Sequence, residues 1–421
     1  MRFLALIFVL LSTPVFALPT GRANWDCETE PVIFPGFWAF KNLGYVGGPT
    51  TIDGARTMAP DVVFMSDKVR LYYLAERQMP VGSKRTVLRV EAPLSDPTNF
   101  TPKGIAFEMP ASVPVTPPAG ASAVGYYAAG PYHASVVPAL DANRAPALDG
   151  QGNPLPWYMY FASVGSNTGV AKSLDGGETF QLVPNKNPLW PFEVYQIKDE
   201  TGAMVWRRHA AVATSKPYDF GGSGSSAGVK TPDGKTHLFT TSAAMLKQTY
   251  EDLGVTASDV GHPSGQVADI GVGYSVSTDG ESFTRKTSQA LGVTSPAAKG
   301  TGRVVDPRKW DAPNGMYEYI VSRPMVFRDD DVWRMMISTH STSYRARSLH
   351  SSDLINWTWD ASPATGTFGL GASGSFDDEH AAYPDCERIG DTYHCYYTGN
   401  GYGHVNHAPT GIGYCTAEAL N

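Results

Sequence analysis

Two carboxyl groups stand out because of their positions in the sequence. Glu379 belongs to the run Asp377-Asp378-Glu379-His380, where we expect neighbouring negative charge to raise the pKa of its carboxyl group. Asp61 opens an apolar stretch that reads as a strand. One protonated and one ionised carboxyl group can perform acid–base chemistry, so we predict Glu379 as the acid and Asp61 as the base or nucleophile. The alternatives are a solvated loop or a calcium site for the acidic run, and a backbone hydrogen-bonding role for Asp61.

Arginine, histidine and tyrosine residues occur ahead of other apolar stretches. Arg323 directly precedes Pro324, and a guanidinium there can bind a carboxylate through two hydrogen bonds. His133 can shuttle a proton or make a polar contact. A purely structural role, such as an ion pair for Arg323, is the alternative. The residues that we predict to bind substrate are Arg56, His133, Arg323, His380, Tyr383 and Asp385.

Predicted loop insertions contain a second cationic group, Arg207-Arg208-His209, and aromatic residues that could stack on a flat ligand. These aromatic residues are Tyr126, Tyr127, Trp190, Trp206 and Tyr402. An exposed loop is the alternative for both groups. The sequence has no His-Glu-x-x-His or paired Cys-x-x-Cys motif, no phosphate-binding loop and no Gly-x-Ser-x-Gly elbow. We therefore predict no metal and no cofactor, apart from the structural calcium ion named above.

A repeated architecture must bring these distant residues together. A short strand pattern, rich in Gly or Ala in most copies, occurs five times, at 89–92, 169–173, 271–275, 345–348 and 411–415. In the first four copies a turn follows that contains an aspartate and ends on an aromatic residue. The turn aspartates are Asp96, Asp175, Asp279 and Asp353. We expect each of them to accept hydrogen bonds from backbone N–H groups of its own turn, which is a structural role.

Upstream of each copy, alternating hydrophobic residues predict two antiparallel strands joined by a polar turn. We therefore predict an all-β fold: a five-bladed β-propeller of four-stranded antiparallel blades with long loop insertions. The predicted blades are residues 55–105, 130–183, 220–287, 318–360 and 376–418, and the insertions are 107–132, 183–222 and 241–269. The first strands of the blades would converge on a central funnel. Asp61, His133, Arg323 and Glu379 would meet there.

The first 17 residues combine a charged start, a short apolar run and a small-residue cleavage site, which is typical of a secretory signal peptide. We predict that residues 18–421 form one domain, secreted or periplasmic after signal-peptide removal. No later segment reaches about 18 consecutive apolar residues, so we expect no membrane span. The net charge of -7 provides no basic patch for nucleic acid. A closed ring covers its own edges, so we expect a monomer.

Four cysteines in a secreted chain predict two disulfides. Cys386 and Cys395 flank a predicted hairpin turn and could bridge it. Cys27 and Cys415 would then join the two ends of the chain. The number of cysteines leaves the other pairings open, and buried free thiols are the alternative.

Several of these segments resemble known propellers. Ser173–Phe180 resembles the Asp-box of sialidases and related propellers, and Ser351–Trp357 resembles the corresponding turn of five-bladed glycosidases such as arabinanases, xylosidases and invertases. Further similarity to those glycosidases lies in Ala59–Phe64, Arg70–Tyr73, Tyr396–Gly401 and Gly411–Tyr414, so the resemblance covers most of residues 55 to 418. It implies a base Asp, a second Asp that tunes the acid, and an acid Glu. Those families place a catalytic Asp before a proline at an inner strand start, where this chain has Ala59, Arg323 and Tyr383.

The resemblance and the paired carboxyl groups lead to one main hypothesis. It is a secreted glycoside hydrolase that cleaves a poly- or oligosaccharide by carboxylate chemistry in the funnel. One alternative is a sialidase-like exo-glycosidase, which would account for the Asp-box and the arginines but has no sixth blade in this sequence. The other is a non-catalytic glycan-binding propeller, which the substituted Asp-Pro positions favour. All three have a carbohydrate as the partner.

Overall fold

The computed structural model describes residues 18–45, 48, 50–80, 83–110, 131–163, 167–187, 189, 194–198, 204–208, 223–243, 270–285, 303–306, 308–309, 317–318, 320–340, 344–361, 365–400 and 411–419. The predicted signal peptide and most of the three predicted insertions lie outside these residues. So do His209 and four of the predicted stacking residues, Tyr126, Tyr127, Trp190 and Tyr402. The regular secondary structure of the described residues is nearly all strand.

The first two strand groups are separate four-stranded antiparallel sheets. One contains β2 (Arg56–Phe64), β3 (Lys68–Gln78), β4 (Ser83–Pro93) and β5 (Thr101–Phe107), in that order. The other contains β6 (Pro131–Val137), β7 (Trp157–Ser163), β8 (Asn167–Ser173) and β9 (Gln181–Leu182), again in chain order. Both sheets therefore have the simple up-and-down order predicted for a blade.

The remaining three groups are linked into one sheet of 13 strands. The third group contains β12 (Ser223–Lys230), β13 (Thr236–Ala243), β14 (Ile270–Ser277) and β15 (Thr284–Arg285). The fourth group contains β19 (Ile320–Asp329), β20 (Val332–His340), β21 (Tyr344–Ser351) and β22 (Thr358–Trp359). The fifth contains β23 (Ala381–Ile389), β24 (Thr392–Gly399) and β25 (Gly411–Glu418), and β1 (Asp26–Cys27) pairs with β25. Single parallel pairs, Ile270 with Ile320 and Arg345 with Ala381, join the three groups. Separate four-stranded sheets are thus found for the first two groups only.

A few short elements accompany these strands. They are the 3-10 helix η1 (Arg22–Asn24), the helix α1 (Phe37–Leu43), the hairpin of β10 (Val194–Lys198) and β11 (Met204–Arg208), β16 (Arg303–Val305), and the pair β17 (Arg308–Lys309) and β18 (Tyr317–Glu318). Trp206, Arg207 and Arg208 belong to β11. Among the described residues, no helix is long and apolar enough to cross a membrane.

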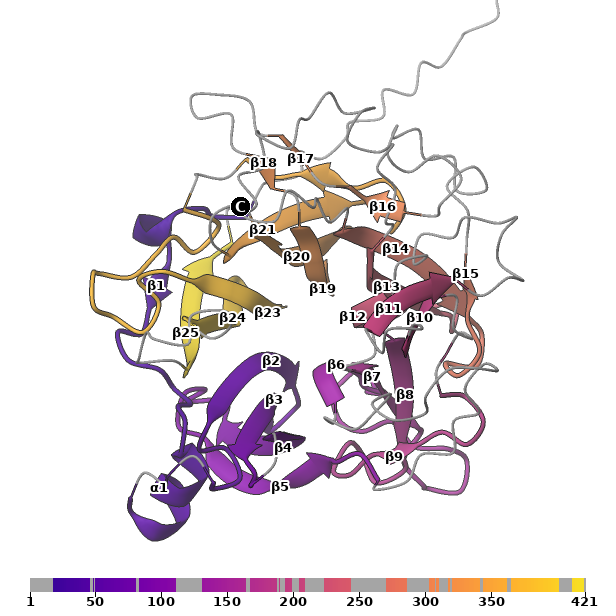
Figure 1. Cartoon of the computed structure of the whole chain (residues 1–421), viewed down its shortest axis with the longest axis horizontal. Coiled ribbons are helices and arrows are strands. Elements are labelled where there is room, and N and C mark those ends of the chain that lie inside the picture. Colours follow the sequence, from indigo (N-terminus) through magenta and orange to yellow (C-terminus); the bar gives the residue numbers. More distant parts are fainter. Residues whose placement is uncertain are drawn as a thin grey trace, which may run out of the picture.

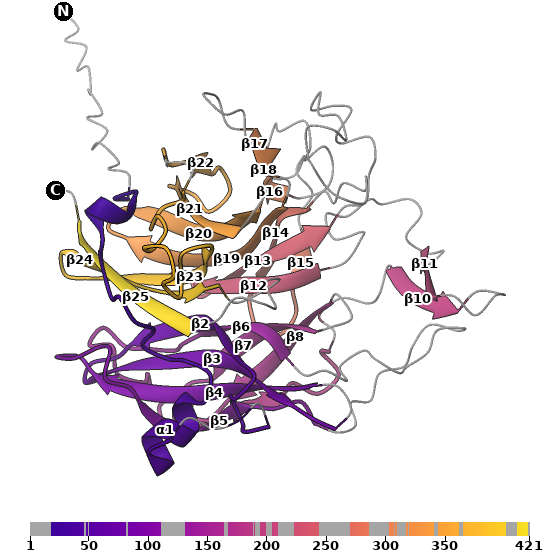
Figure 2. The same cartoon turned by 60° about the vertical axis from the view of Figure 1, so that its left-hand side comes forward.

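The strand groups are arranged around a common centre (Figure 1), with β2, β6, β12, β19 and β23 innermost. These first strands touch one another in a closed cycle: β2 contacts β6, β6 contacts β12, β12 contacts β19, β19 contacts β23, and β23 contacts β2. Figure 2 shows the groups edge-on, with α1 beside the first group. The cycle brings five segments from distant parts of the chain to one place.

Hydrophobic packing occurs between the groups as well as within them. Successive residues of a strand point to opposite faces, so one strand can supply two cores. In β3, Leu71 and Tyr73 pack with Tyr396 and Tyr414 of the fifth group, whereas Tyr72 packs with Trp157 of the second. Further clusters join the second group to the third, the third to the fourth and the fourth to the fifth. Burial on both faces explains why β3 is almost continuously buried along its length.

The predicted disulfides are both present. Cys386–Cys395 bridges the β23–β24 hairpin, and Cys27–Cys415 joins β1 to β25 across 388 positions of sequence. The described residues contain no free cysteine. The second bridge attaches the N-terminal strand to the fifth group, which ties together the two ends of the described structure.

The aspartate turns are local hydrogen-bonded units. Asp175 accepts hydrogen bonds from the backbone N–H groups of Glu178 and Thr179 at 2.9 and 3.0 Å, and from the Thr179 hydroxyl at 2.6 Å. Asp279 and Asp353 accept equivalent backbone bonds. These three turns have the expected structural role, whereas in the fourth the Asp96 carboxylate accepts from the Thr98 hydroxyl.

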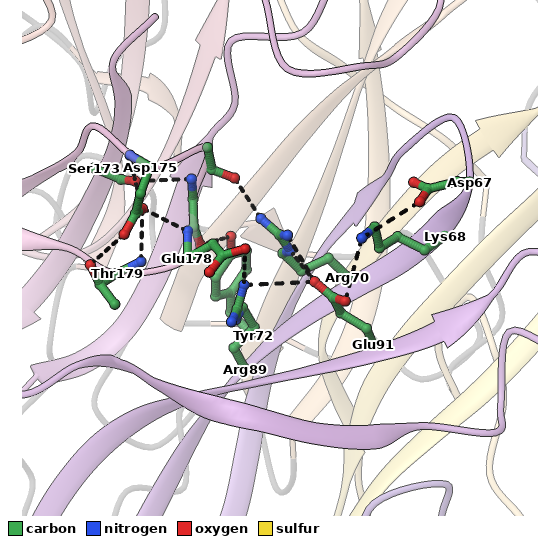
Figure 3. A network of polar contacts seen from close by, with 12 residues as sticks. Asp67, Lys68, Arg70, Tyr72, Arg89, Glu91, Ser173, Asp175, Glu178 and Thr179 are labelled. Carbon is green, nitrogen blue, oxygen red and sulfur yellow. Dashed lines mark hydrogen bonds and ion pairs between the residues drawn. The ribbon is translucent and has the colours of Figure 1, made fainter. Parts of the chain in front are cut away.

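The turn at Asp175 also docks the second group against the first (Figure 3). Tyr72 on β3 donates a hydrogen bond of 2.6 Å to the carbonyl of Gly177, and Arg70 donates one of 2.5 Å to that of Gly176. Arg70 is in turn held by Glu91 at 2.8 Å. A local turn motif therefore also contributes contacts between neighbouring groups.

Candidate functional site

Each innermost strand is interrupted by a β-bulge near its start. The register shifts lie between Met58 and Asp61, Tyr132 and Ala134, Ser223 and Ser226, Ser322 and Met325, and Ala382 and Asp385. In four of the five bulges a residue other than glycine has a left-handed backbone. These residues are Ala59, His133, Arg323 and Tyr383, with φ values of 52°, 49°, 54° and 54°. A left-handed conformation costs such residues roughly 1–3 kcal/mol, and such strain is concentrated at functional sites.

Hydroxyl groups of neighbouring strand groups hold three of these bulges. The Ala59 N–H donates to Thr398 Oγ1 at 2.9 Å, the Arg323 N–H to Thr241 Oγ1 at 2.7 Å, and the Tyr383 N–H to Ser338 Oγ at 2.8 Å. In each case the hydroxyl comes from the second strand of the preceding group. The bulge conformation therefore depends on packing between groups, which a local sequence pattern does not report.

The bulge residues surround a narrow central cavity, with about 20 Å³ available to the centre of a water-sized sphere. Its lining consists of Ala59, Pro60, His133, Ala134, Ser225, Ser226, Arg323, Pro324, Met325, Tyr383 and Pro384. Every innermost strand contributes to it. The cavity therefore lies at the positions where the resemblance to five-bladed glycosidases places catalytic residues, and its described lining includes no Asp or Glu.

Two of the lining residues carry buried side-chain polar atoms. His133 Nε2 and Tyr383 OH lack a hydrogen-bond partner among the described residues. His133 is 5% exposed and Tyr383 is 4% exposed. Their rings are in edge contact, with centroids 5.3 Å apart. An unsatisfied buried polar atom costs about 1–3 kcal/mol, so such atoms are normally paired, often with water or a ligand.

Arg323 lies against the aromatic wall of the cavity. Its guanidinium is 3.5 Å from the ring centre of Tyr383 and 5.3 Å from that of Tyr344. Stacking uses the flat face of the guanidinium and orients its edge, which carries the N–H donors. Arg323 is therefore a positioned cation at the cavity.

The electrostatic environment keeps His133 neutral. Burial, together with the positive charges of Arg323 and Arg85, lowers the pKa of His133 well below its usual value. Arg85 lies over the ring of Tyr132 at 4.7 Å and pairs with Glu76 at 3.0 Å. The imidazole is therefore uncharged at neutral pH and can accept a hydrogen bond.

Asp61 and Asp385 lie just beyond the bulges and outside the cavity lining. Asp61 is 2% exposed and accepts a hydrogen bond of 3.0 Å from the Val136 N–H of β6. Asp385 is 6% exposed and accepts one from the Val62 N–H of β2. Burial raises the pKa of both carboxyl groups well above the usual value, and the charge of Asp61 further raises that of Asp385. The two residues thus join consecutive innermost strands. For Asp61 this is the backbone hydrogen-bonding role that the sequence left open as the alternative to catalysis.

Glu379 and His380 lie on the loop before β23. The Glu379 N–H and the His380 N–H both donate to Asn400 Oδ1, at 3.1 and 2.9 Å, and the Glu379 carbonyl accepts from Arg345 at 2.6 Å. Glu379 is half-buried, whereas His380 is buried with its ring 5.9 Å from that of Tyr344. Because Tyr344 also contacts Tyr383 at 5.4 Å, a chain of aromatic contacts links this loop to the cavity.

The rest of the acidic run makes internal contacts. Asp377 accepts hydrogen bonds from Arg22 and Tyr397, both at 2.7 Å, and Asp378 accepts one from Asn400 at 2.8 Å. Within the described ranges there is no group of three or more His, Cys, Asp or Glu side chains placed to hold a metal ion. Arg56, at the start of β2, pairs in register with Glu76 and is absent from the cavity lining.

Of the eight residues predicted to form the site, the structure therefore brings His133, Arg323 and Tyr383 together in the cavity lining. Tyr344, which sequence reasoning missed, begins β21 and reaches the site only through tertiary packing. Arg85 was also missed, since it lies on β4 and nothing in its local sequence distinguishes it. The three lining residues share a signal that was available: each lies near the start of an innermost strand, and two of them precede a proline.

No protein-family profile and no curated protein matches this chain. Solved structures do match it over most of its length. The chain has the fold of propeller glycoside hydrolases. A glycoside hydrolase is 12% identical, with a TM-score of 0.53 over 87% of this chain and 88% of that chain. A glycosyl hydrolase from Bacteroides ovatus is 13% identical, with a TM-score of 0.51 over 94% of both chains.

A third structure comes from the GH130 family of mannoside phosphorylases, described as containing glycoside hydrolases that target β-1,2 mannosidic linkages in Candida mannan. It is 12% identical, with a TM-score of 0.51 over 96% of this chain and 95% of that chain. These likenesses establish the fold, because identity this low says little about chemistry. They confirm the resemblance to propeller glycosidases that the turn motifs indicated.

Proposed function

We propose that this chain is a secreted glycosidase built on a five-bladed propeller, which hydrolyses a glycosidic bond of a glycan bound in the central cavity. One observation carries the proposal. The strained bulge residues His133, Arg323 and Tyr383 converge on one cavity, and two of them present buried polar atoms that lack partners among the described residues. Strain and unsatisfied polar atoms of this kind are features of ligand sites. The cycle of strand contacts supports five blades.

Hydrolysis needs one group that protonates the leaving oxygen and another that activates water. We assign the first role to Glu379, because its backbone is held in place and aromatic contacts connect its loop to the cavity. We assign the second to His133, whose neutral imidazole would orient the attacking water by accepting a hydrogen bond from it as water adds to the anomeric carbon and the C–O bond breaks, with the proton of that water passing to solvent. Asp61 becomes a positioning residue, since its carboxyl group holds the β6 backbone beside His133.

A panel of polysaccharides and aryl glycosides, assayed for released sugar, tests the proposal. Glu379→Gln should lower the rate about 100-fold or more on the best substrate, which is the usual contribution of a general acid. Glu418→Gln, the same change at an exposed site on β25, should leave the rate unchanged. Wild-type protein that binds a glycan of the panel but releases no product from any of them would remove the enzymatic proposal.

A non-catalytic glycan-binding propeller is the second candidate. The observation that favours it is the described cavity lining, which includes no Asp or Glu, although glycosidases usually use a pair of carboxyl groups. This candidate predicts the outcome just described: binding without product. A sialidase-like activity would instead appear as release of a terminal sialic acid from the same panel.

A further inference from the structure

The chemical character of the cavity indicates a class of ligand. Arg323 is at the lining, and Arg85 is close enough for its charge to act on the buried His133 together with that of Arg323. No Asp or Glu belongs to the lining among the described residues. A cavity with cationic groups and no lining carboxylate attracts an anion and disfavours a cation.

The hydrogen-bonding groups narrow the class further. Tyr383 OH is a buried donor with no partner among the described residues. The Arg323 guanidinium carbon lies 3.5 Å from the centre of the Tyr383 ring. A guanidinium oriented by stacking presents a planar set of N–H donors that matches the two oxygens of a carboxylate. The aromatic rings of Tyr383 and Tyr344 provide a surface for the apolar face of a sugar.

We propose that the cavity binds the carboxylate of an acidic sugar, with Arg323 as its ionic partner and the Tyr383 hydroxyl as a hydrogen-bond donor. The cavity is narrow, with about 20 Å³ available to the centre of a water-sized sphere, so it suits a small polar group at the end of a glycan rather than a whole sugar ring. The proposal rests on the proposed function and specifies its substrate class. The carboxylate can come from a uronic acid or from a sialic acid, and binding measurements distinguish the two.

Calorimetric titration of the full chain with single sugars tests the proposal directly. The probes are glucuronate, galacturonate and N-acetylneuraminate, with glucose, galactose and the methyl ester of N-acetylneuraminate as their uncharged counterparts. At least one acid should bind about tenfold or more tightly than its uncharged counterpart, because hydrogen bonds to charged groups contribute more than neutral ones. Added salt should weaken the binding of the acid.

Variants locate the interaction. Arg323→Met should weaken binding of the preferred acid about 10- to 100-fold, and Tyr383→Phe, which keeps the ring, should weaken it less. Arg323→Lys should recover only part of the affinity because it lacks the planar donor set. The control Arg328→Met removes an exposed arginine from the same strand, where it stacks on Trp333 at 4.9 Å, and should bind like wild type. Circular dichroism confirms that each variant is folded.

Two results would overturn the proposal: acids and neutral sugars binding equally, or undiminished acid binding by folded Arg323→Met. The outcomes also separate this inference from the proposed function. Cleavage of neutral glycans alone would refute the acidic ligand and keep the proposed glycosidase activity. Tight binding of an acidic sugar without cleavage of any glycan that carries it would support the acidic ligand and refute the proposed glycosidase activity.

Discussion

The buried carboxyl groups of Asp61 and Asp385 should make the stability of this protein depend on pH. Each accepts a hydrogen bond from the neighbouring innermost strand, and burial raises the pKa of both well above the usual value. Asp385→Asn replaces one of them with a neutral side chain of the same shape. The amide oxygen can still accept from the Val62 N–H, so the bond between β23 and β2 is kept.

The sign and size of the effect follow from proton linkage. An acid with a raised pKa in the folded state keeps a proton that the unfolded chain releases, so its contribution to stability is complete below the unfolded pKa of about 3.9. That contribution is lost as the pH rises through the folded pKa. One such proton corresponds to a slope of about 1.4 kcal/mol per pH unit. Asp385→Asn should therefore match wild type near pH 4 and become the more stable protein, by up to this amount per unit, as the pH rises.

Urea unfolding followed by tryptophan fluorescence, with the disulfides intact and at several values between about pH 4 and pH 8, measures the difference. Asp67→Asn is the control, because the Asp67 side chain is 67% exposed. This control tests whether the loss of an exposed carboxyl group produces the same pH-dependent difference as the loss of a buried one. A constant difference between Asp385→Asn and wild type across the whole range would refute the reasoning, because it would mean that Asp385 releases its proton equally in both states.

Two further predictions use the same unfolding assay. Asp175→Ala should lower the free energy of unfolding by about 2 kcal/mol, because it removes the acceptor of four hydrogen bonds in its turn. Asp96→Ala should cost less, and equal losses would contradict the distinction between the two turns. Replacing Cys27 and Cys415 with serine should cost about 3 kcal/mol more than removing the β23–β24 bridge. The chain-entropy model predicts this because the separations are 388 and 9 residues. A larger loss for the hairpin bridge would count against that model here.

Much of the fold was predictable because its signals are local. Alternation of apolar residues predicted the strands, and the aspartate turns marked the outer ends of the groups, where Asp175, Asp279 and Asp353 make the expected backbone bonds. Hairpin geometry also favoured the correct partner for Cys386. The linkage of three groups into one sheet was not predicted, because it rests on single pairs such as Ile270 with Ile320 between segments far apart in sequence.

The site was less predictable, since its groups meet only in the folded chain. Arg323 and Tyr383 were selected because they precede prolines at strand starts, and the bulges do place their side chains at the cavity. Asp61 has an equally suggestive position, but it lies two residues beyond Ala59. Its side chain accepts a hydrogen bond from the Val136 N–H of β6 and is absent from the cavity lining. The position of the bulge in each strand decides which side chain faces the centre. Local sequence propensity does not determine that position.

By itself, the sequence determined the all-β character, the repeated strand groups, the turn chemistry and the cysteine pairing that hairpin geometry favours, because each of these depends on neighbours a few residues apart. Only the tertiary structure decided which residues share the central cavity, that two carboxyl groups are buried between strands, and that Arg323 lies on Tyr383. The physical reason is that the bulges are held by hydroxyl groups of neighbouring strand groups. Their geometry exists only once those groups have packed around a common centre.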